Sequence, residues 1–163
     1  VAARLDLYMR WPDLDGYSET ARNDFNHAGG SKNILFLTFE EASMSRDMSG
    51  RFQPIYSELI KKPGMPVAGG MTIYDFNEKS GYLDEALAVV DRPGDLPFVS
   101  RCLKGEAAAQ SLAPCERDIQ IGDGLSLTFR FPAGLLKDWP KLEAAVRARA
   151  TSLLKTGTAP SGT

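Results

Sequence analysis

Apolar and polar residues alternate along several short stretches of the chain, and this alternation predicts β-strands. In the segment LSLTFRF, which spans 125–131, every odd position is apolar and every even position is polar. A strand places successive side chains on opposite faces, so one face of this segment is expected to be buried and the other wet. Together with short apolar runs, the same reasoning predicts strands at 5–11, 33–40, 71–76, 85–91, 98–103, 118–121 and 125–131.

Two turns predict how neighbouring strands are joined. Gly122-Asp123-Gly124 supplies residues that tolerate a positive φ angle, which a tight hairpin needs. Arg92-Pro93-Gly94-Asp95 has the proline and glycine of a turn and would join the strands on either side as a second hairpin.

Three helices are predicted from four-residue and three-residue spacing of apolar side chains. A short helix is expected at 18–27, and a second one at 52–60, with Ser49 as its N-terminal cap and Pro63-Gly64 as its stop. The polar stretch 41–50 before it is expected to be a surface connection. A final helix capped by Asp138 carries the apolar stripe Trp139, Leu142, Val146 and Leu153.

This order of elements predicts an α+β fold with a largely antiparallel sheet of about five to seven strands and about three helices. A chain of 163 residues is long enough for one domain with its own core, which we expect to span 1–155. The small, polar residues 156–163 are expected to form a disordered C-terminal tail.

The charge of the chain gives no support to a nucleic-acid or lipid partner. The formal net charge is −2, and neither half of the chain has an excess of basic residues. No run of about 18 apolar residues is present that could cross a membrane. The sequence begins at Val1 rather than at a methionine, so we expect it to be a fragment of a longer protein or a mature chain, from which a signal peptide or an N-terminal anchor could have been removed.

The chain has two cysteines, Cys102 and Cys115, which are separated by twelve small and polar residues. A disulfide between them would close a short loop, which contributes about 3 kcal/mol in the chain-entropy model. Such a bond would place the domain in an oxidising compartment such as the periplasm. The alternative is a pair of free thiols in a cytosolic protein. A zinc site is disfavoured because it needs about four ligands, and the single histidine, His27, is remote in sequence.

His27 is the strongest candidate for acid–base chemistry, since its ordinary pKa lies near neutrality. Asp24 and Ser31 are close in sequence and could serve as an orienting acid and a nucleophile. However, the chain has no G-x-S-x-G motif, which would expose a nucleophilic serine. At the end of a short helix, a capping or solvated role for this histidine is the simpler interpretation.

Other candidate motifs have simpler interpretations. The segment Gly29-Gly30-Ser31-Lys32 lacks the order and the following helix of a phosphate-binding loop. Glu40 and Glu41 would point to opposite faces of a strand, and Asp13-Leu14-Asp15 is too sparse for a calcium loop. No cofactor and no metal are therefore expected. The aromatic residues at strand spacing are more typical of a core than of a ligand pocket.

Three arginines, Arg101, Arg117 and Arg130, cluster in sequence around the cysteines and the hairpin. They could form a patch that contacts a partner protein or a small anion. The alternative is that they are exposed strand residues that face water or the neighbouring carboxylates Glu116 and Asp118.

The stretch 98–139 resembles a group of uncharacterised proteobacterial proteins with an N-terminal membrane anchor and a small exported domain. The residues that carry the resemblance are Arg101-Cys102, Cys115 followed by Arg117, the segment LTFRFP at 127–132, Leu136 and Asp138-Trp139. The strand 5–11 with Pro12, and the run 35–38, resemble the group more loosely. The resemblance implies a removed membrane anchor and a disulfide formed in the periplasm. It implies no activity and no site residues.

We therefore expect a non-enzymatic periplasmic domain, tethered to the inner membrane, that binds another protein of the cell envelope. An accessory or immunity protein of a secretion system is one version of this hypothesis. The alternatives are a periplasmic hydrolase that uses His27 with carboxylates assembled by the fold, and a domain that binds a small ligand in an aromatic cleft of several hundred Å³.

Overall fold

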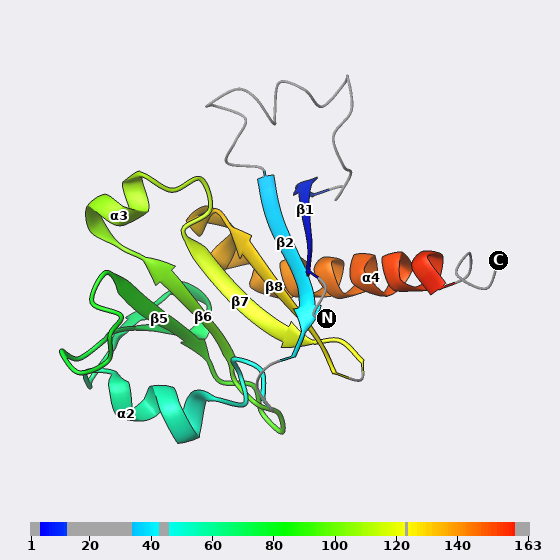
Figure 1. Ribbon diagram of the computed structural model, residues 1–163. Coiled ribbons are helices and arrows are strands. Elements are labelled where there is room, and N and C mark those ends of the chain that lie inside the picture. Colours follow the sequence, from blue (N-terminus) through cyan, green and yellow to red (C-terminus); the bar gives the residue numbers. More distant parts are fainter. Residues whose placement is uncertain (1–3, 13–33, 43–45, 123, 159–163) are drawn as a thin grey trace.

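A computed structural model describes residues 4–12, 34–42, 46–122 and 124–158 of the chain, and it is built around one eight-stranded antiparallel sheet (Figure 1). The order of the strands is β1-β2-β8-β7-β6-β5-β4-β3. The bounds are β1 Arg4–Arg10, β2 Ile34–Glu41, β3 Met65–Val67, β4 Met71–Asp75, β5 Glu85–Val90, β6 Phe98–Leu103, β7 Cys115–Gln120 and β8 Leu125–Phe131. The α+β class and the antiparallel sheet are confirmed, but there are eight strands rather than five to seven.

The topology is a meander with an N-terminal hairpin added at one edge. Strands β3 to β8 follow one another in sequence and in space, and both predicted hairpins, β5–β6 and β7–β8, are present. Strand β2 pairs with β8, and β1 pairs with β2 at the edge of the sheet. The additional strand β3 has only three residues and contains Pro66, so it gave no alternation to detect.

The sheet divides into two halves between β6 and β7. These strands pair only at Arg101↔Glu116 and Cys102↔Cys115, whereas the strands on either side of them pair along nearly their whole length. We call β3–β6 the first half and β7, β8, β2 and β1 the second half. From Ser100 toward Phe98, β6 is no longer paired with β7. The segment 46–51 approaches β7 there, since the Met48 amide donates a hydrogen bond to the Asp118 carbonyl at 3.4 Å.

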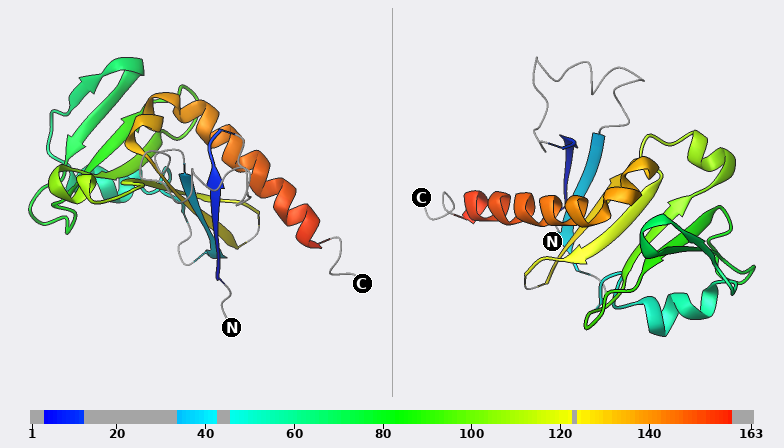
Figure 2. Two further views of the ribbon diagram at one scale, coloured as in Figure 1. Left: turned by 90° about the horizontal axis from the view of Figure 1, so that it is seen from above. Right: turned by 180° about the vertical axis from the view of Figure 1, so that it is seen from behind.

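The second half packs against the long helix α4 (Trp139–Thr158), which crosses its strands on one face (Figure 2). Residues that are directly opposite in antiparallel strands point to the same side, so the register assigns a single face to the buried side chains. This core contains Met9, Leu35, Leu37, Phe39, Cys115, Ile119, Leu127, Phe129, Phe131, Leu142, Val146 and Ala150.

The first half packs against Leu136 and Trp139 on the α4 side and is also covered on the opposite face. A π-helical turn, η2 (Phe52–Tyr56), continues into the short helix α2 (Ser57–Leu59), and both pack against Leu87, Val89 and Val99. Met48 belongs to this core and is fully buried, so the prediction that 41–50 is a surface connection is wrong at this residue. The predicted Ser49 cap is also wrong, because η2 has no side-chain cap and Ser49 is buried beside the sheet instead.

The remaining short helices are α3 (Gly105–Ala109), which lies between the cysteines, and the 3₁₀ turns η3 (Ala68–Gly70) and η4 (Ala133–Asp138). Asp138 ends η4, which leads directly into α4. Trp139 then stacks on Phe98 of β6 with ring centroids 4.6 Å apart, so α4 begins on the first half. The helix continues past 156, where we predicted the tail to start; the helix predicted at 18–27 and residues 159–163 lie outside the described residues.

Among the described helices, none is both long and apolar enough to cross a membrane.

Candidate binding surface

Cys102 and Cys115 form a disulfide, as predicted. The two residues lie directly opposite each other in β6 and β7, at one of the two positions where the halves of the sheet are paired. The bond therefore joins the two halves, in addition to closing the loop that contains α3. Neither cysteine is a free thiol, and no cluster of metal-ligating side chains occurs among the described residues.

Arg117 is buried, and its predicted place in a surface patch is wrong, since its residue is only 1% exposed. It shares the face of β7 with Cys115 and Ile119, toward α4. Its Nε donates to Glu143 Oε1 at 2.7 Å, and its Nη1 donates to the Ser49 hydroxyl at 2.7 Å and to the Val99 carbonyl at 3.0 Å. Burial lowers the pKa of this guanidinium, and the nearby Glu143 carboxylate opposes the effect.

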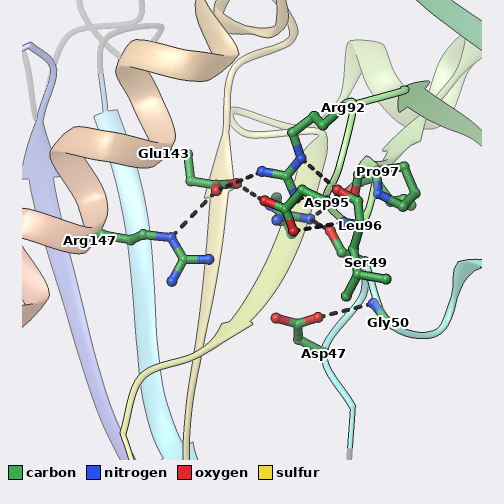
Figure 3. A network of polar contacts seen from close by, with 11 residues as sticks. Asp47, Ser49, Gly50, Arg92, Asp95, Leu96, Pro97, Glu143 and Arg147 are labelled. Atoms are coloured by element: carbon green, nitrogen blue, oxygen red, sulfur yellow. Dashed lines mark hydrogen bonds and ion pairs between the residues drawn. The ribbon is translucent and has the colours of Figure 1, made fainter.

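Glu143 is the centre of this buried network, and its carboxylate lies between Arg92 and Arg147 in Figure 3. Arg92 comes from the β5–β6 turn and contacts Glu143 Oε2 at 3.4 Å, as does Arg147 from the next turn of α4. Arg117 makes the third ion pair, at 2.7 Å. One carboxylate on α4 thus binds arginines from both halves of the sheet and from its own helix, which identifies the network as structural.

Arg101 and Arg130 point to the face opposite Arg117. Arg101 pairs with Glu116 at 3.1 Å and with Glu85 at 3.6 Å, and its guanidinium lies over the ring of Tyr82. Its side chain is mostly buried. Arg130 is exposed and lies over the ring of Phe36 at 5.2 Å. The structure therefore brings two of the three predicted arginines to one face and separates the third.

We call the side of the second half that faces away from α4 the open face, because no described helix packs on it. The register assigns fourteen side chains to it: Arg4, Asp6, Tyr8, Arg10, Ile34, Phe36, Thr38, Glu40, Glu116, Asp118, Gln120, Ser126, Thr128 and Arg130. Hydrogen bonds from the Thr38 hydroxyl, at 2.6 Å, and from Arg4 lower the pKa of Asp6. The alternation of the first strand correctly predicted Tyr8 on the polar side, whereas sequence reasoning missed Phe36, which the alternation of β2 also places there.

A small polar depression lies at one end of the open face. Its volume is about 180 Å³, and Glu40, Asp118 and Thr128 are among the residues that line it. Arg51 forms an ion pair with Asp118 at its base, with Nη2 2.7 Å from Oδ1. Two wider depressions, of about 650 and about 500 Å³, lie beside α3 and beside the segment 46–54. None of these three is lined by an aromatic side chain, so none is the aromatic cleft of the small-ligand hypothesis.

The aromatic residues at strand spacing belong mainly to the core, as predicted. Phe98, Phe129 and Phe131 are fully buried. His27, Asp24, Asp13, Asp15 and the segment 29–32 lie outside the described residues, so the hypotheses built on them stay predictions.

The chain was compared with known proteins. No protein-family model matches it, and no curated protein matches it. Among solved structures, the chain is similar to an immunity protein of the Stenotrophomonas maltophilia type IV secretion system. The TM-score is 0.52, the sequences are 15% identical, and the match covers 89% of this chain and 79% of that chain. The likeness is one of fold. It places the nearly complete chain, rather than one motif, in the same architecture as a proteobacterial immunity protein.

Proposed function

We propose that this chain is a periplasmic domain without enzymatic activity that binds another protein, and that it acts as an immunity protein. In this role it would bind a toxic protein delivered by a secretion system and block its action in the cell envelope. The observation that carries the proposal is the likeness of fold, over 89% of the chain, to an immunity protein of such a system.

Two features of the molecule support the same proposal. The disulfide Cys102–Cys115 fits an oxidising compartment, since disulfides persist in the periplasm and are rare in the cytosol. The open face, on which no described helix packs, offers polar and aromatic side chains to a partner. Tethering to the inner membrane by a preceding segment remains part of the proposal, on the family resemblance alone.

The test begins with a search for the partner. The immobilised chain is used to select from a phage library that displays fragments of the genome encoding it, and the selected protein is then produced in the periplasm of a Gram-negative laboratory strain. We expect this protein alone to stop growth and co-production of the chain in the periplasm to restore it. A harmless partner, or no selected partner, would contradict the immunity role.

The matched control tests the compartment. The same chain is produced without an export signal, so that it stays in the cytosol, where its cysteines remain reduced. We expect no protection in this case. Equal protection from the cytosol would contradict a periplasmic site of action while leaving protein binding intact.

A further inference from the structure

A continuous row of side chains crosses the open face from β6 to β1. Arg101 lies opposite Glu116, Glu116 opposite Arg130, Arg130 opposite Phe36, and Phe36 opposite Tyr8. Residues directly opposite in antiparallel strands have side chains close enough to contact each other. We call Tyr8, Phe36 and Arg130 the aromatic–arginine row.

Among the described residues, Arg130 forms no ion pair with a carboxylate, although its charge contributes to the lowered pKa of Asp6. Glu116, its neighbour on β7, is held by Arg101 at 3.1 Å. Asp6, on the same face, is held by Thr38 and Arg4. The guanidinium carbon of Arg130 lies 5.2 Å from the centre of the Phe36 ring. Within the described part of the chain, the row thus leaves one exposed guanidinium without an ion pair, even though four carboxylates share its face, those of Asp6, Glu40, Glu116 and Asp118.

The aromatic members of the row give this cation a fixed and partly apolar setting. Tyr8 meets Phe36 edge to face at 5.1 Å and is itself 60% exposed. A guanidinium over an aromatic ring is restricted in its rotamers and still offers planar N–H donors, which match both oxygens of a carboxylate. Tyrosine and arginine are also the side chains that dominate binding energy at protein interfaces.

We propose that the aromatic–arginine row binds an acidic segment of the partner protein, in which an Asp or Glu carboxylate pairs with Arg130 and a neighbouring apolar side chain packs on Tyr8 and Phe36. The proposal rests on the protein-binding function proposed above and adds the surface and the chemistry of what it recognises. Charge complementarity decides the occupant: an unpaired cation beside exposed aromatic carbon favours an acidic and apolar peptide over a basic one.

The probe for this proposal is a random dodecapeptide library on phage, selected on the immobilised full chain. We expect enrichment of peptides that contain Asp or Glu next to an apolar residue. The same selection on the Arg130→Glu variant should lose this enrichment. A selection on the wild type that enriches no acidic peptides would overturn the proposal, as would acidic enrichment that survives unchanged on Arg130→Glu.

An enriched peptide is then synthesised and titrated against variants. Arg130→Glu should weaken its binding roughly tenfold or more, because a charge-assisted hydrogen bond is replaced by repulsion. Arg130→Lys should weaken it less, since it keeps the charge but not the planar fork. Lys141→Glu is the matched control: it makes the same charge reversal at an exposed position on α4, on the other side of the sheet, and should leave binding unchanged.

The outcomes separate this proposal from the immunity role. Equal effects of Arg130→Glu and Lys141→Glu would mean that only net charge matters, and the row would be rejected as a site. Growth protection by the wild type can still succeed in that case. Conversely, peptide binding that depends on Arg130 without growth protection would retain the site and reject the immunity role.

Discussion

The two halves of the sheet differ in how they are covered: side chains pack on both faces of the first half, whereas described helices pack on only one face of the second half. In the first half, η2 and α2 cover the side that carries Leu87, Val89 and Val99. In the second half, α4 covers the other side, which carries Leu37, Phe129 and Phe131. The side of the second half that continues the face under η2 and α2 is therefore not covered by any of the helices that the structure describes. The open face results from the length and placement of the described helices, and it is a sheet surface rather than a cleft.

The junction between β6 and β7 is also unusual. With only two residue pairs joining these strands, the halves depend on other connections. The disulfide is one of them, the buried Arg117–Glu143 network is another, and the Trp139–Phe98 stack is a third. The predictions below test how strongly each half depends on the junction.

Glu143→Gln should have the largest effect. It removes the one carboxylate, among the described residues, that forms an ion pair with the buried Arg117 guanidinium, and breaking a buried ion pair from one side costs about 3–5 kcal/mol of stability. Urea denaturation followed by circular dichroism measures the loss. Arg147→Gln is the control: it removes an ion pair to the same carboxylate from a side chain that is 43% exposed, and should cost less than about 1 kcal/mol.

A second variant keeps this prediction testable if Glu143→Gln does not fold. Replacing both partners, as Arg117→Met with Glu143→Leu, removes the buried charges together and should recover much of the lost stability. If Glu143→Gln costs no more than Arg147→Gln, the charge of Arg117 is compensated elsewhere, and the network does not hold the halves together.

Removing the disulfide should have the next largest effect. Cys102→Ala with Cys115→Ala is expected to lower the free energy of unfolding by about 3 kcal/mol, within the range of about 2–5 kcal/mol for native disulfides. Because the bond lies at the junction, amide hydrogen exchange should speed up most in β6 and β7. The amides that pair β2 with β8 lie inside the second half and serve as the internal control. Uniform acceleration over all strands would contradict a specific role at the junction.

Much of the fold could be predicted from the sequence, because alternation and turns are local signals. The bounds of β6 and β8 agree with the predicted strands, and glycine and proline correctly indicated both hairpins. The strand count was too low because β3 is three residues long and lacks a pattern. The burial of Met48 could not be predicted, since it depends on the separation of two strands that lie far away in sequence.

The candidate site was predicted only in part, and the reason differs for each arginine. Arg117 is in phase with Cys115 and Ile119, so the alternation of β7 already favoured a buried position for it. Its partner Glu143 could not be found, because no local pattern relates a strand residue to a helix 26 positions later. Arg130 was correctly identified as a polar strand position, but its contact with Phe36 requires the pairing of β8 with β2.

The smallest expected effect contrasts two carboxylates, one in each half. Burial raises the pKa of Glu85 in the first half, with a smaller opposing effect from Arg101, whereas hydrogen bonds from Thr38 and Arg4 lower the pKa of Asp6 on the open face. A carboxyl group whose pKa is raised in the folded state contributes stability below pH 4.5, the ordinary pKa for Glu85. This contribution is lost as the pH rises through the pKa of the folded state. A carboxyl group whose pKa is lowered in the folded state contributes stability above pH 3.8, the ordinary pKa for Asp6. This contribution is lost as the pH falls through the pKa of the folded state.

The two neutral variants should therefore have opposite pH dependence relative to the wild type. As the pH rises from 3 to 7, Glu85→Gln should gain stability relative to the wild type, and Asp6→Asn should lose it, each by a small amount because both side chains contact solvent. Urea midpoints at several pH values measure the difference, and carboxyl NMR titration assigns it to the residue. If both variants changed in the same direction, the carboxylates of the two halves would have similar surroundings, and the contrast between a covered first half and an open second half would fail at these positions.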